Sequence, residues 1–276
     1  MNLLFSAGDI GPPVHITPSP IFEIAGWQIS NSIFYGWIVS IFLIIILFVA
    51  SIRSAIHPKG GFVQIVETGT EFIVDLLKNS LGSRLKAVKY APYFTAIFFF
   101  IALSNLLGLL PILGEAFTIH ENPAFRPFTA DLNGTLAASL VSLAMVQYFA
   151  IKESGPIRHL KHYFSGNLIN PLTYIAGIYE LFAEVVRLFS LALRLFLNIA
   201  IGEIIISVFA YLGKFAAPIT ALPFLALEVG VAVLQAYIFV MLTVTYLSLA
   251  IKHSDTSDHE FEEKLVHTMQ SQKLAK

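Results

Sequence analysis

Long apolar stretches separated by more polar segments dominate this chain, and their lengths are those of membrane-spanning helices. A helix of about 20 apolar residues is long enough to cross the hydrocarbon core of a bilayer. Three stretches have about this length, and we predict spans over residues 34–51, 93–110 and 134–151. Two longer apolar stretches follow, at residues 171–213 and 218–251.

The two longest stretches exceed what a bilayer needs. At about 1.5 Å per residue they would form helices of roughly 60 and 50 Å, whereas the hydrocarbon core is about 30 Å thick. Such helices either break or cross with a strong tilt, and no proline interrupts either interior except Pro223, near a start. We therefore expect two long, strongly tilted helices joined as a hairpin through residues 214–217. The fold class is then an all-α polytopic membrane protein with five membrane-crossing helices.

Between the first two spans, apolar residues recur with the period of an α-helix. The apolar positions are Phe62, Ile65, Val66, Gly69, Phe72, Ile73, Leu76 and Leu77, and the opposite face carries Glu67, Glu71, Asp75 and Lys78. We predict an amphipathic helix within a cytoplasmic region over residues 62–89. Such a helix lies either on the membrane surface or against partner helices, and the pattern suits both.

The distribution of charge predicts the orientation of the chain. Residues 1–30 contain no Lys or Arg and four Pro, so we predict an irregular, non-cytoplasmic arm. Basic residues cluster at 53–89 and 152–161, which places these segments in the cytoplasm by the positive-inside rule. Five spans then leave the C-terminus inside, where polar residues 252–276 form a solvated tail. The whole chain, residues 1–276, is treated as a single membrane domain.

Composition supports the membrane class and removes several others. Hydrophobic residues make up 56% of the 276 residues and charged residues only 13%, about half the share of an ordinary soluble domain. No basic patch interleaved with aromatic residues suggests nucleic acid as a partner. The chain has no cysteine, which excludes disulfides and thiolate metal sites, and its eight histidines are scattered. We predict no metal, no cofactor and no catalytic residue.

One charged residue stands inside the longest apolar stretch. Arg194 lies among leucines, where an uncompensated guanidinium costs about 2.5–3.5 kcal/mol in a bilayer. Arginine cannot avoid this cost by losing its proton. Arg194 should therefore face a carboxylate or a water-filled path. The alternative is a structural ion pair, for example with Glu184 or Glu228.

Further polar residues follow a pattern around Arg194. Ser190, Arg194 and Asn198 are spaced by four residues and share a helix face, whereas Glu203 lies about 180° around the helix from Arg194. Arg187, seven residues before Arg194, lies on nearly the same face.

The second long helix carries Glu228 and Gln235 on one face. In a hairpin turning near residues 214–217, Glu203 and Glu228 lie at similar distances from the turn, and so do Arg194 and Gln235. Two adjacent buried acids suit a proton relay. The alternatives are that either acid fills a packing defect, or that Gln235 only joins helices.

Two polar residues precede the third span. Asp131 and Asn133 lie where a polar path through the membrane could begin, but Asp and Asn are also preferred at the N-cap of a helix. Glu180 and Glu184, near the start of the first long helix, are either part of such a path or simply solvated at the membrane interface.

These motifs resemble subunit a of the rotary, F-type ATP synthase. The segment Leu193–Asn198 followed by Gly202–Glu203, and later Leu234–Phe239, resembles the arginine and glutamine motifs of that family. Asp131–Asn133 is similar to its short acidic motif opening a middle span, and Ser190 stands where the family has a small residue four before its arginine. The ending Tyr246–Ser248 is also similar, and the resemblance covers roughly residues 30–252.

The resemblance implies an ion-translocating stator subunit without an active site of its own. Two aqueous half-channels would carry protons to and from carboxylates of a c-subunit ring and so couple ion flow to rotation and ATP synthesis. The implied partners are the c ring, the b subunits of the peripheral stalk, other ATP synthase subunits and the lipid bilayer. The implied location is a bacterial inner membrane, with an organellar energy-transducing membrane as the alternative. The candidate ion-translocation residues are Arg194, Asn198, Glu203, Glu228, Gln235, Ser190, Asp131 and Asn133.

Two positions depart from the family pattern. Leu197 stands where the family usually has a small residue, and Glu228 stands where some members have histidine. A secondary transporter that binds an anionic substrate through Arg194 is the competing hypothesis, but it predicts internal repeats and broken helices, which are not evident. A purely structural membrane scaffold would not explain Arg194, Glu203 and Gln235 together.

Overall fold

A computed structural model describes most of the chain, in ranges with gaps between them. The described residues are 19–24, 27–53, 61–109, 118–119, 122–123, 126–155 and 171–274. The chain divides into two compact units, and each of the two long C-terminal helices contributes residues to both units. The first unit comprises Met1–Val66, Ala96–Thr135 and Ala192–Ile238, and the second comprises Glu67–Thr95, Leu136–Leu191 and Phe239–Lys276.

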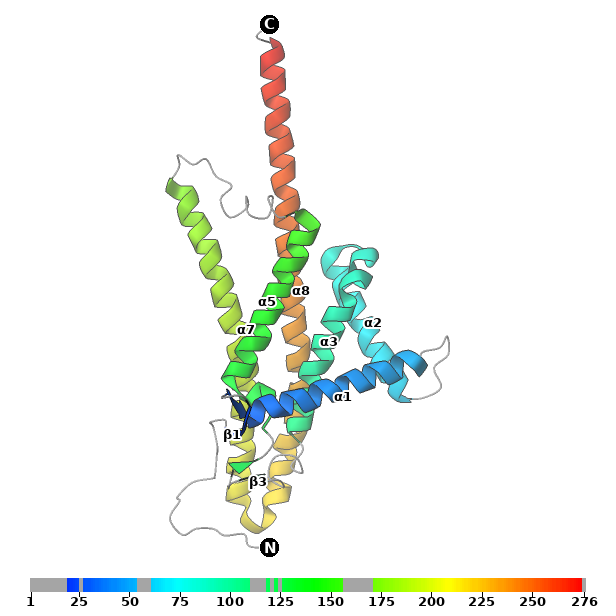
Figure 1. Cartoon of the computed structure of the whole chain (residues 1–276), viewed down its shortest axis with the longest axis vertical. Helices are drawn as coiled ribbons and strands as arrows, with labels where there is room; N and C mark the ends of the chain where they lie inside the picture. The colour runs from blue at the N-terminus through cyan, green and yellow to red at the C-terminus, as the bar shows by residue number, and fades with distance from the viewer. Residues whose placement is uncertain are drawn as a thin grey trace. The chain divides into compact units, whose positions relative to one another are not determined.

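Helices make up nearly all of the described structure (Figure 1). The α-helices are α1 (Asn31–Arg53), α2 (Gly61–Leu81), α3 (Arg84–Gly108), α5 (Leu132–Ser154), α7 (Pro171–Gly213) and α8 (Ala217–Leu274). The short elements are β1 (Pro20–Ile24), β2 (Trp27–Ser30), β3 (Thr118–Ile119), β4 (Asn122–Pro123), and the 3-10 turns η1 (Phe128–Ala130) and η2 (Lys214–Ala216).

Within the described residues, five helices are long and apolar enough to cross a membrane. They are Asn31–Arg53, Arg84–Gly108, Leu132–Glu153, Phe182–Gly213 and Ala217–Ile251. The prediction of an all-α polytopic membrane protein with five membrane-crossing helices is therefore confirmed.

The second span begins earlier than the predicted residue 93. Helix α2 ends at Leu81, and Gly82 then adopts a left-handed φ of +68°, which glycine tolerates without steric cost. Helix α3 starts at Arg84 and continues through Pro92. The lysines expected in a cytoplasmic loop thus lie on the first turns of a helix, because a charged helix end costs little once it extends beyond the hydrocarbon core. The proposed helix stop at Pro111 lies outside the described residues.

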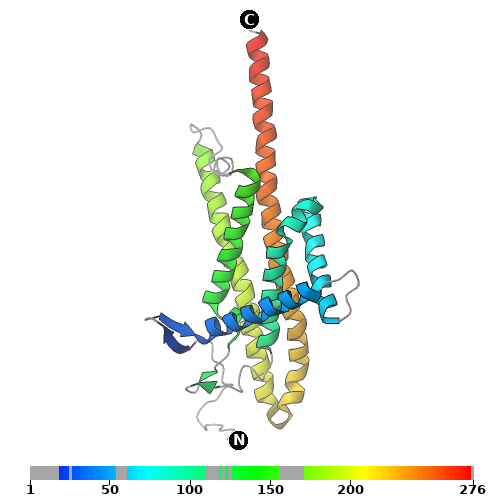
Figure 2. The same cartoon turned by 45° about the vertical axis from the view of Figure 1, so that its right-hand side comes forward.

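The C-terminal hairpin of the first unit is built from the end of α7 and the start of α8, which turn at η2 in the yellow part of the chain (Figure 2). The rings of Phe209 and Phe224 stack with centroids 3.8 Å apart. The Thr220 hydroxyl donates a hydrogen bond to the Phe209 carbonyl at 2.9 Å, close to Gly213. Both long helices continue without a break through the described part of this hairpin. The hairpin therefore lacks the unwound segments of the discontinuous helices found in many transporters.

The remainder of the first unit packs α1 against α3. The Tyr35 hydroxyl donates a hydrogen bond to the carbonyl of Ser104 at 3.0 Å, and both residues are buried. Ahead of α1, β1 pairs with β2 in an antiparallel hairpin. The N-terminal arm is therefore not irregular throughout: the prediction missed this hairpin because its strands are only five and four residues long and the first one lacks a clear alternation of apolar and polar residues.

In the second unit, α2 buries one of its faces. Ile73 and Leu77 of α2 are fully buried, whereas Phe72 is 46% exposed. The hydroxyl of Ser248 on α8 donates a hydrogen bond to the carbonyl of Ser80 at 2.7 Å. This bond joins the C-terminal end of α2 to α8. Part of the apolar face of α2 is thus covered within the protein and part is left open. Helix α8 also continues beyond Ile251 to Leu274, so the polar tail has a helical backbone.

Candidate functional site

Arg194 lies on an open face of α7 in the first unit. Its side chain is exposed, and its neighbours along this face are apolar and exposed as well. Leu197 is 45% exposed and Ile201 is 50% exposed. The opposite face packs inside the unit, where Leu195 and Ile199 are buried. In the first unit, the described part of α7 thus presents the Arg194 cation within an exposed apolar surface.

The span that carries Arg194 is the least covered of the five. Of its most apolar stretch, 17% is buried within the chain, against 44% for the span formed by α3. A surface of this kind needs lipid or another protein to cover it, and lipid alone would not solvate a guanidinium.

Glu203 and Glu228 meet in the α7–α8 hairpin. Glu228 is only 7% exposed, and its carboxylate lies so close to Gly202 that a β-carbon at that position would overlap it. Glu203, the next residue on α7, is half-buried. The structure therefore brings together the two acids that the sequence pattern placed at similar distances from the turn.

Gln235 lies two turns of α8 beyond Glu228. It is 5% exposed, whereas Arg194 is exposed, and no hydrogen bond joins these two residues in the part of the chain that the structure describes. Nearby, the Asn105 amide of α3 reaches the carbonyl of Ala232 at 3.5 Å. Gln235 is thus placed in the hairpin interior rather than on the open face.

The residues spaced by four around Arg194 differ in their surroundings. Ser190 is exposed. Asn198 is half-buried, and its amide nitrogen is buried with no hydrogen-bond partner among the described residues. A buried amide donor without a partner costs about 1–3 kcal/mol, so water or another chain would stabilise it.

Asp131 is the N-cap of α5. Its carboxylate is buried and accepts a hydrogen bond from the backbone N–H of Asn133 at 3.0 Å. The side chain of Asn133 is exposed. The geometry supports the capping role that the sequence left open for Asp131, and it leaves Asn133 with its side chain outside the interior.

Arg187 has an aromatic partner, whereas none is found for Arg194 among the described residues. In the second unit its guanidinium lies over the ring of Tyr246, 5.1 Å from the ring centroid. It also lines a small cavity with Ser139 and Ser142. A cation–π contact stabilises the charge by about 0.5–2 kcal/mol, so Arg187 is satisfied within the chain.

The sequence pattern did not reveal that Arg126 is buried. This arginine of the segment before α5 is only 5% exposed and donates a hydrogen bond from Nη2 to the Ala130 carbonyl at 3.0 Å. In the sequence it was simply the one basic residue of an acidic outer segment, and no spacing rule places such a residue in the interior.

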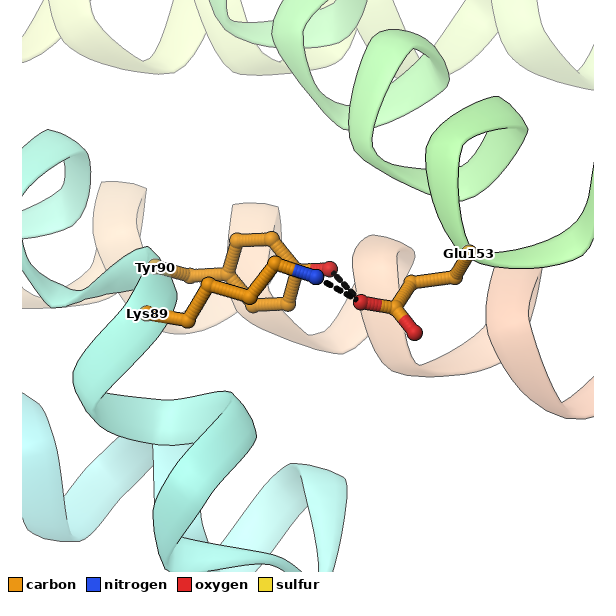
Figure 3. Close-up of polar contacts among 3 residues, drawn as sticks. All are labelled: Lys89, Tyr90 and Glu153. Atoms are coloured by element: carbon orange, nitrogen blue, oxygen red, sulfur yellow. Dashed lines mark hydrogen bonds and ion pairs between the residues drawn. The ribbon is translucent and has the colours of Figure 1, made fainter.

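A polar cluster in the second unit was also missed (Figure 3). Lys89 Nζ lies 2.5 Å from Glu153 Oε1, and the Tyr90 hydroxyl donates to the same oxygen. Lys89 is 47% exposed, so this ion pair between α3 and α5 contributes about 0–1 kcal/mol. The cluster joins two helix ends and has no feature of a binding site.

Comparisons with known proteins show which family shares these features. The model of a family described as ATP synthase A chain matches residues 33–248. A protein of Chlorobaculum tepidum named ATP synthase subunit a 2 is 32% identical over 283 residues, covering 96% of this chain and 75% of that protein. ATP synthase subunit a of Sulfurihydrogenibium sp. is 34% identical over 195 residues, covering 70% and 83% of the two chains.

This chain belongs to the ATP synthase A chain family. The resemblance predicted from the arginine and glutamine motifs is confirmed. Membership makes the chain a component of the membrane sector of F-type ATP synthase, in a complex with other ATP synthase subunits. It also assigns the chain to ATP synthesis and ion transport in a membrane.

Every candidate site residue falls inside the matched range of the ATP synthase A chain family. ATP synthase subunit a of Moorella thermoacetica, at 27% identity, is spanned almost completely, with 96% of its length covered. The two departures from the family pattern also have clear positions: Leu197 is on the open face beside Arg194, and Glu228 is buried in the hairpin.

Proposed function

We propose that this chain is the ion-translocating stator subunit of the ATP synthase, which carries protons through two aqueous half-channels to and from the carboxylates of a c-subunit ring. Ion flow is thereby coupled to rotation of the ring and to ATP synthesis. The observation that supports this proposal best is the exposure of Arg194 on the uncovered apolar face of α7.

The chemistry of that face fits one kind of partner. Leu197 and Ile201 offer an apolar surface to helices of the ring, and Arg194 offers a fixed positive charge to an ionised carboxylate on them. The attraction is about 4 kcal/mol at 4 Å with an effective dielectric constant near 20. The guanidinium does not release its proton, so it also blocks a direct proton leak between the two half-channels.

Proton entry is assigned to the acid pair of the hairpin. Glu203 and Glu228 line the half-channel from the outside, with Gln235 deeper in the hairpin and Asp131 and Asn133 toward its outer mouth. On the Arg194 face, Asn198 and Ser190 contribute polar groups that contact water or the ring. The driving force across the membrane is about 2.3 kcal/mol per charge for each 100 mV.

The remaining partners follow from the same assignment. The b subunits of the peripheral stalk would contact other exposed apolar surface of the spans, and the lipid bilayer would cover the rest. The bacterial relatives are consistent with a location in a bacterial inner membrane.

Disulfide crosslinking tests the contact directly, because the chain has no cysteine of its own. A cysteine at exposed Leu197 should crosslink to a cysteine placed beside the ring carboxylate in the assembled complex. A cysteine at buried Ile199 serves as the matched control and should not crosslink. Equal crosslinking of both, or of neither under oxidising conditions, would contradict the proposed face.

A further inference from the structure

Glu184 of α7 is bound to α5 inside the second unit. The side chain of Gln147 on α5 donates a hydrogen bond from Nε2 to Glu184 Oε1 at 2.5 Å. Both side chains are half-buried, and both residues lie within membrane-spanning helices. The sequence left open whether Glu184 belongs to a polar path or is simply solvated. The contact with Gln147 gives its carboxylate a fixed position between two spans.

A small cavity lies further along the same side of α7. Leu188 and Leu191 line it, four and seven residues after Glu184 and therefore on one side of the helix. Ser139 and Ser142 of α5 also line it; both are fully buried, and neither hydroxyl has a hydrogen-bond partner among the described residues. The cavity offers about 10 Å³, and one water molecule needs about 10–15 Å³. One water thus fits beside the two hydroxyls and can bind them.

Glu184 has a basic and an acidic neighbour on its own helix. Glu180 precedes it by four residues and Arg187 follows it by three. The Arg187 guanidinium lies over the ring of Tyr246 on α8, 5.1 Å from the centroid, and it lines the same cavity. Arginine keeps its proton, so Arg187 contributes a constant charge. A positive charge repels protons, and a carboxylate one helical turn away offsets part of that repulsion.

The charged residues at the end of α5 make other contacts. Glu153 Oε1 lies 2.5 Å from Lys89 Nζ of α3 (Figure 3). Lys152 Nζ lies over the ring of Tyr148, 5.9 Å from its centroid. Neither contact involves Glu184, so Glu153 offers a control acid in the same unit.

The orientation predicted from the basic segments places Glu184 on the cytoplasmic side of Arg194. Glu184 lies ten residues before Arg194, toward the end of α7 that follows the basic segment 152–161. Glu203, which is assigned to the outer half-channel, lies nine residues beyond Arg194 in the other direction. The two acids are therefore on opposite sides of Arg194 along the helix.

We propose that Glu184 is the acid of the inner half-channel that exchanges protons with the cytoplasm, and that Gln147 is the positioning residue that holds its carboxylate. During ATP-driven pumping the carboxylate accepts a proton from cytoplasmic water and passes it inward to water in the serine-lined cavity; during ATP synthesis the transfer is reversed. The inner path then begins inside the chain, between α5 and α7. The proposal rests on the proposed function, because it names residues of the inner half-channel.

ATP-driven acidification of inverted vesicles tests this assignment, since their outer medium corresponds to the cytoplasmic side. Glu184→Gln in the assembled complex should lower transport roughly tenfold. An acid at the entrance collects protons where they are scarce. The defect, measured against wild type at the same pH, should therefore deepen as the outer pH is raised and should not depend on the pH of the vesicle lumen.

Two further variants complete the test. Gln147→Leu leaves the acid in place but removes its hydrogen bond, so it should cause a smaller loss with the same dependence on outer pH. Glu153→Gln removes the control acid and should leave transport near the wild-type rate. A loss in Glu153→Gln of the same size and pH dependence as in Glu184→Gln would overturn the inference.

The remaining outcomes separate this inference from the proposed function. A Glu184→Gln defect that is independent of outer pH, or that follows the lumen pH instead, shows a structural role and overturns the inference. If Glu184→Gln does not assemble, Gln147→Leu decides: a defect that deepens with outer pH supports the inference, and any other result overturns it. Normal transport in Glu184→Gln, with transport lost in Arg194→Ala, overturns the inference but not the proposed function. Normal transport in Arg194→Ala overturns the proposed function itself.

Discussion

The carboxylate of Glu228 lies directly against Gly202, and this contact places Glu228 beside the turn of α7 that carries Glu203. The approach is possible only because residue 202 has no side chain. The hairpin contacts near the turn, between Phe209 and Phe224, align the two helices so that this approach occurs. A glycine on one helix thus creates the space in which an acid of the other helix is buried.

Gly202→Ala should therefore slow proton transport. The added methyl group must displace the Glu228 carboxylate, and a misplacement of about 1 Å in a proton-carrying group lowers the rate on the order of tenfold or more. Alanine normally stabilises a helix relative to glycine by about 1 kcal/mol. A Gly202→Ala variant that is less stable than the wild type would therefore also indicate the steric overlap with Glu228. Gly230→Ala is the control, since a β-carbon there meets nothing within 4 Å. Equal transport rates in the two variants would contradict the contact.

The acid pair should show coupled effects. We expect Glu203→Gln and Glu228→Gln each to slow transport without stopping it, because the other acid and water still pass protons. If the acids act in parallel, the double variant should be slower than the product of the single effects, whereas in a serial relay each single change removes most of the rate. A double-mutant cycle on proton transport distinguishes the two cases. Exposed Glu23→Gln is the control, and wild-type rates in the double variant would show that both acids are structural.

Leu197 should be sensitive to an increase in size. It lies on the open face beside Arg194, so Leu197→Trp should hinder rotation by overpacking against the ring, at a cost of about 1–3 kcal/mol. Leu197→Gly should be tolerated, because a smaller side chain leaves the ring more room at this face. Ile44→Trp, at a 66% exposed position of α1, adds comparable bulk elsewhere and should have little effect. ATP-driven acidification measures transport in each Trp variant, and subunit co-purification measures its assembly. Normal transport and assembly in Leu197→Trp would show that this face contacts lipid rather than the ring.

The sequence predicted the long helices well, since their limits depend on local chemistry. Helix α7 spans Pro171–Gly213 as predicted, because proline favours a helix start and the apolar pattern ends at Gly213. The start of α3 was missed because Lys86 and Lys89 have the composition of a loop, although charged residues form helix readily outside the hydrocarbon core.

The burial of Arg126 could not be predicted from the sequence. It depends on contacts that Phe128 makes with Gly36 of α1 and Phe100 of α3, which are distant along the chain. The same holds for the open face of α7: periodicity placed Arg194 and Asn198 on one face, but only the fold determines which face the chain covers. Local patterns predict elements, whereas burial of a single charge depends on long-range packing.

The most direct measurement of the central claim is ATP-driven acidification of inverted membrane vesicles carrying Arg194→Ala. We expect the complex to assemble with its other subunits and to lose coupled proton transport, because the ring carboxylate loses its counter-charge and the two half-channels lose their separator. Arg187→Ala is the matched control on the same helix, and it should retain most transport, since that guanidinium is stacked on Tyr246 within the chain. Normal acidification by an assembled complex carrying Arg194→Ala would contradict the assignment.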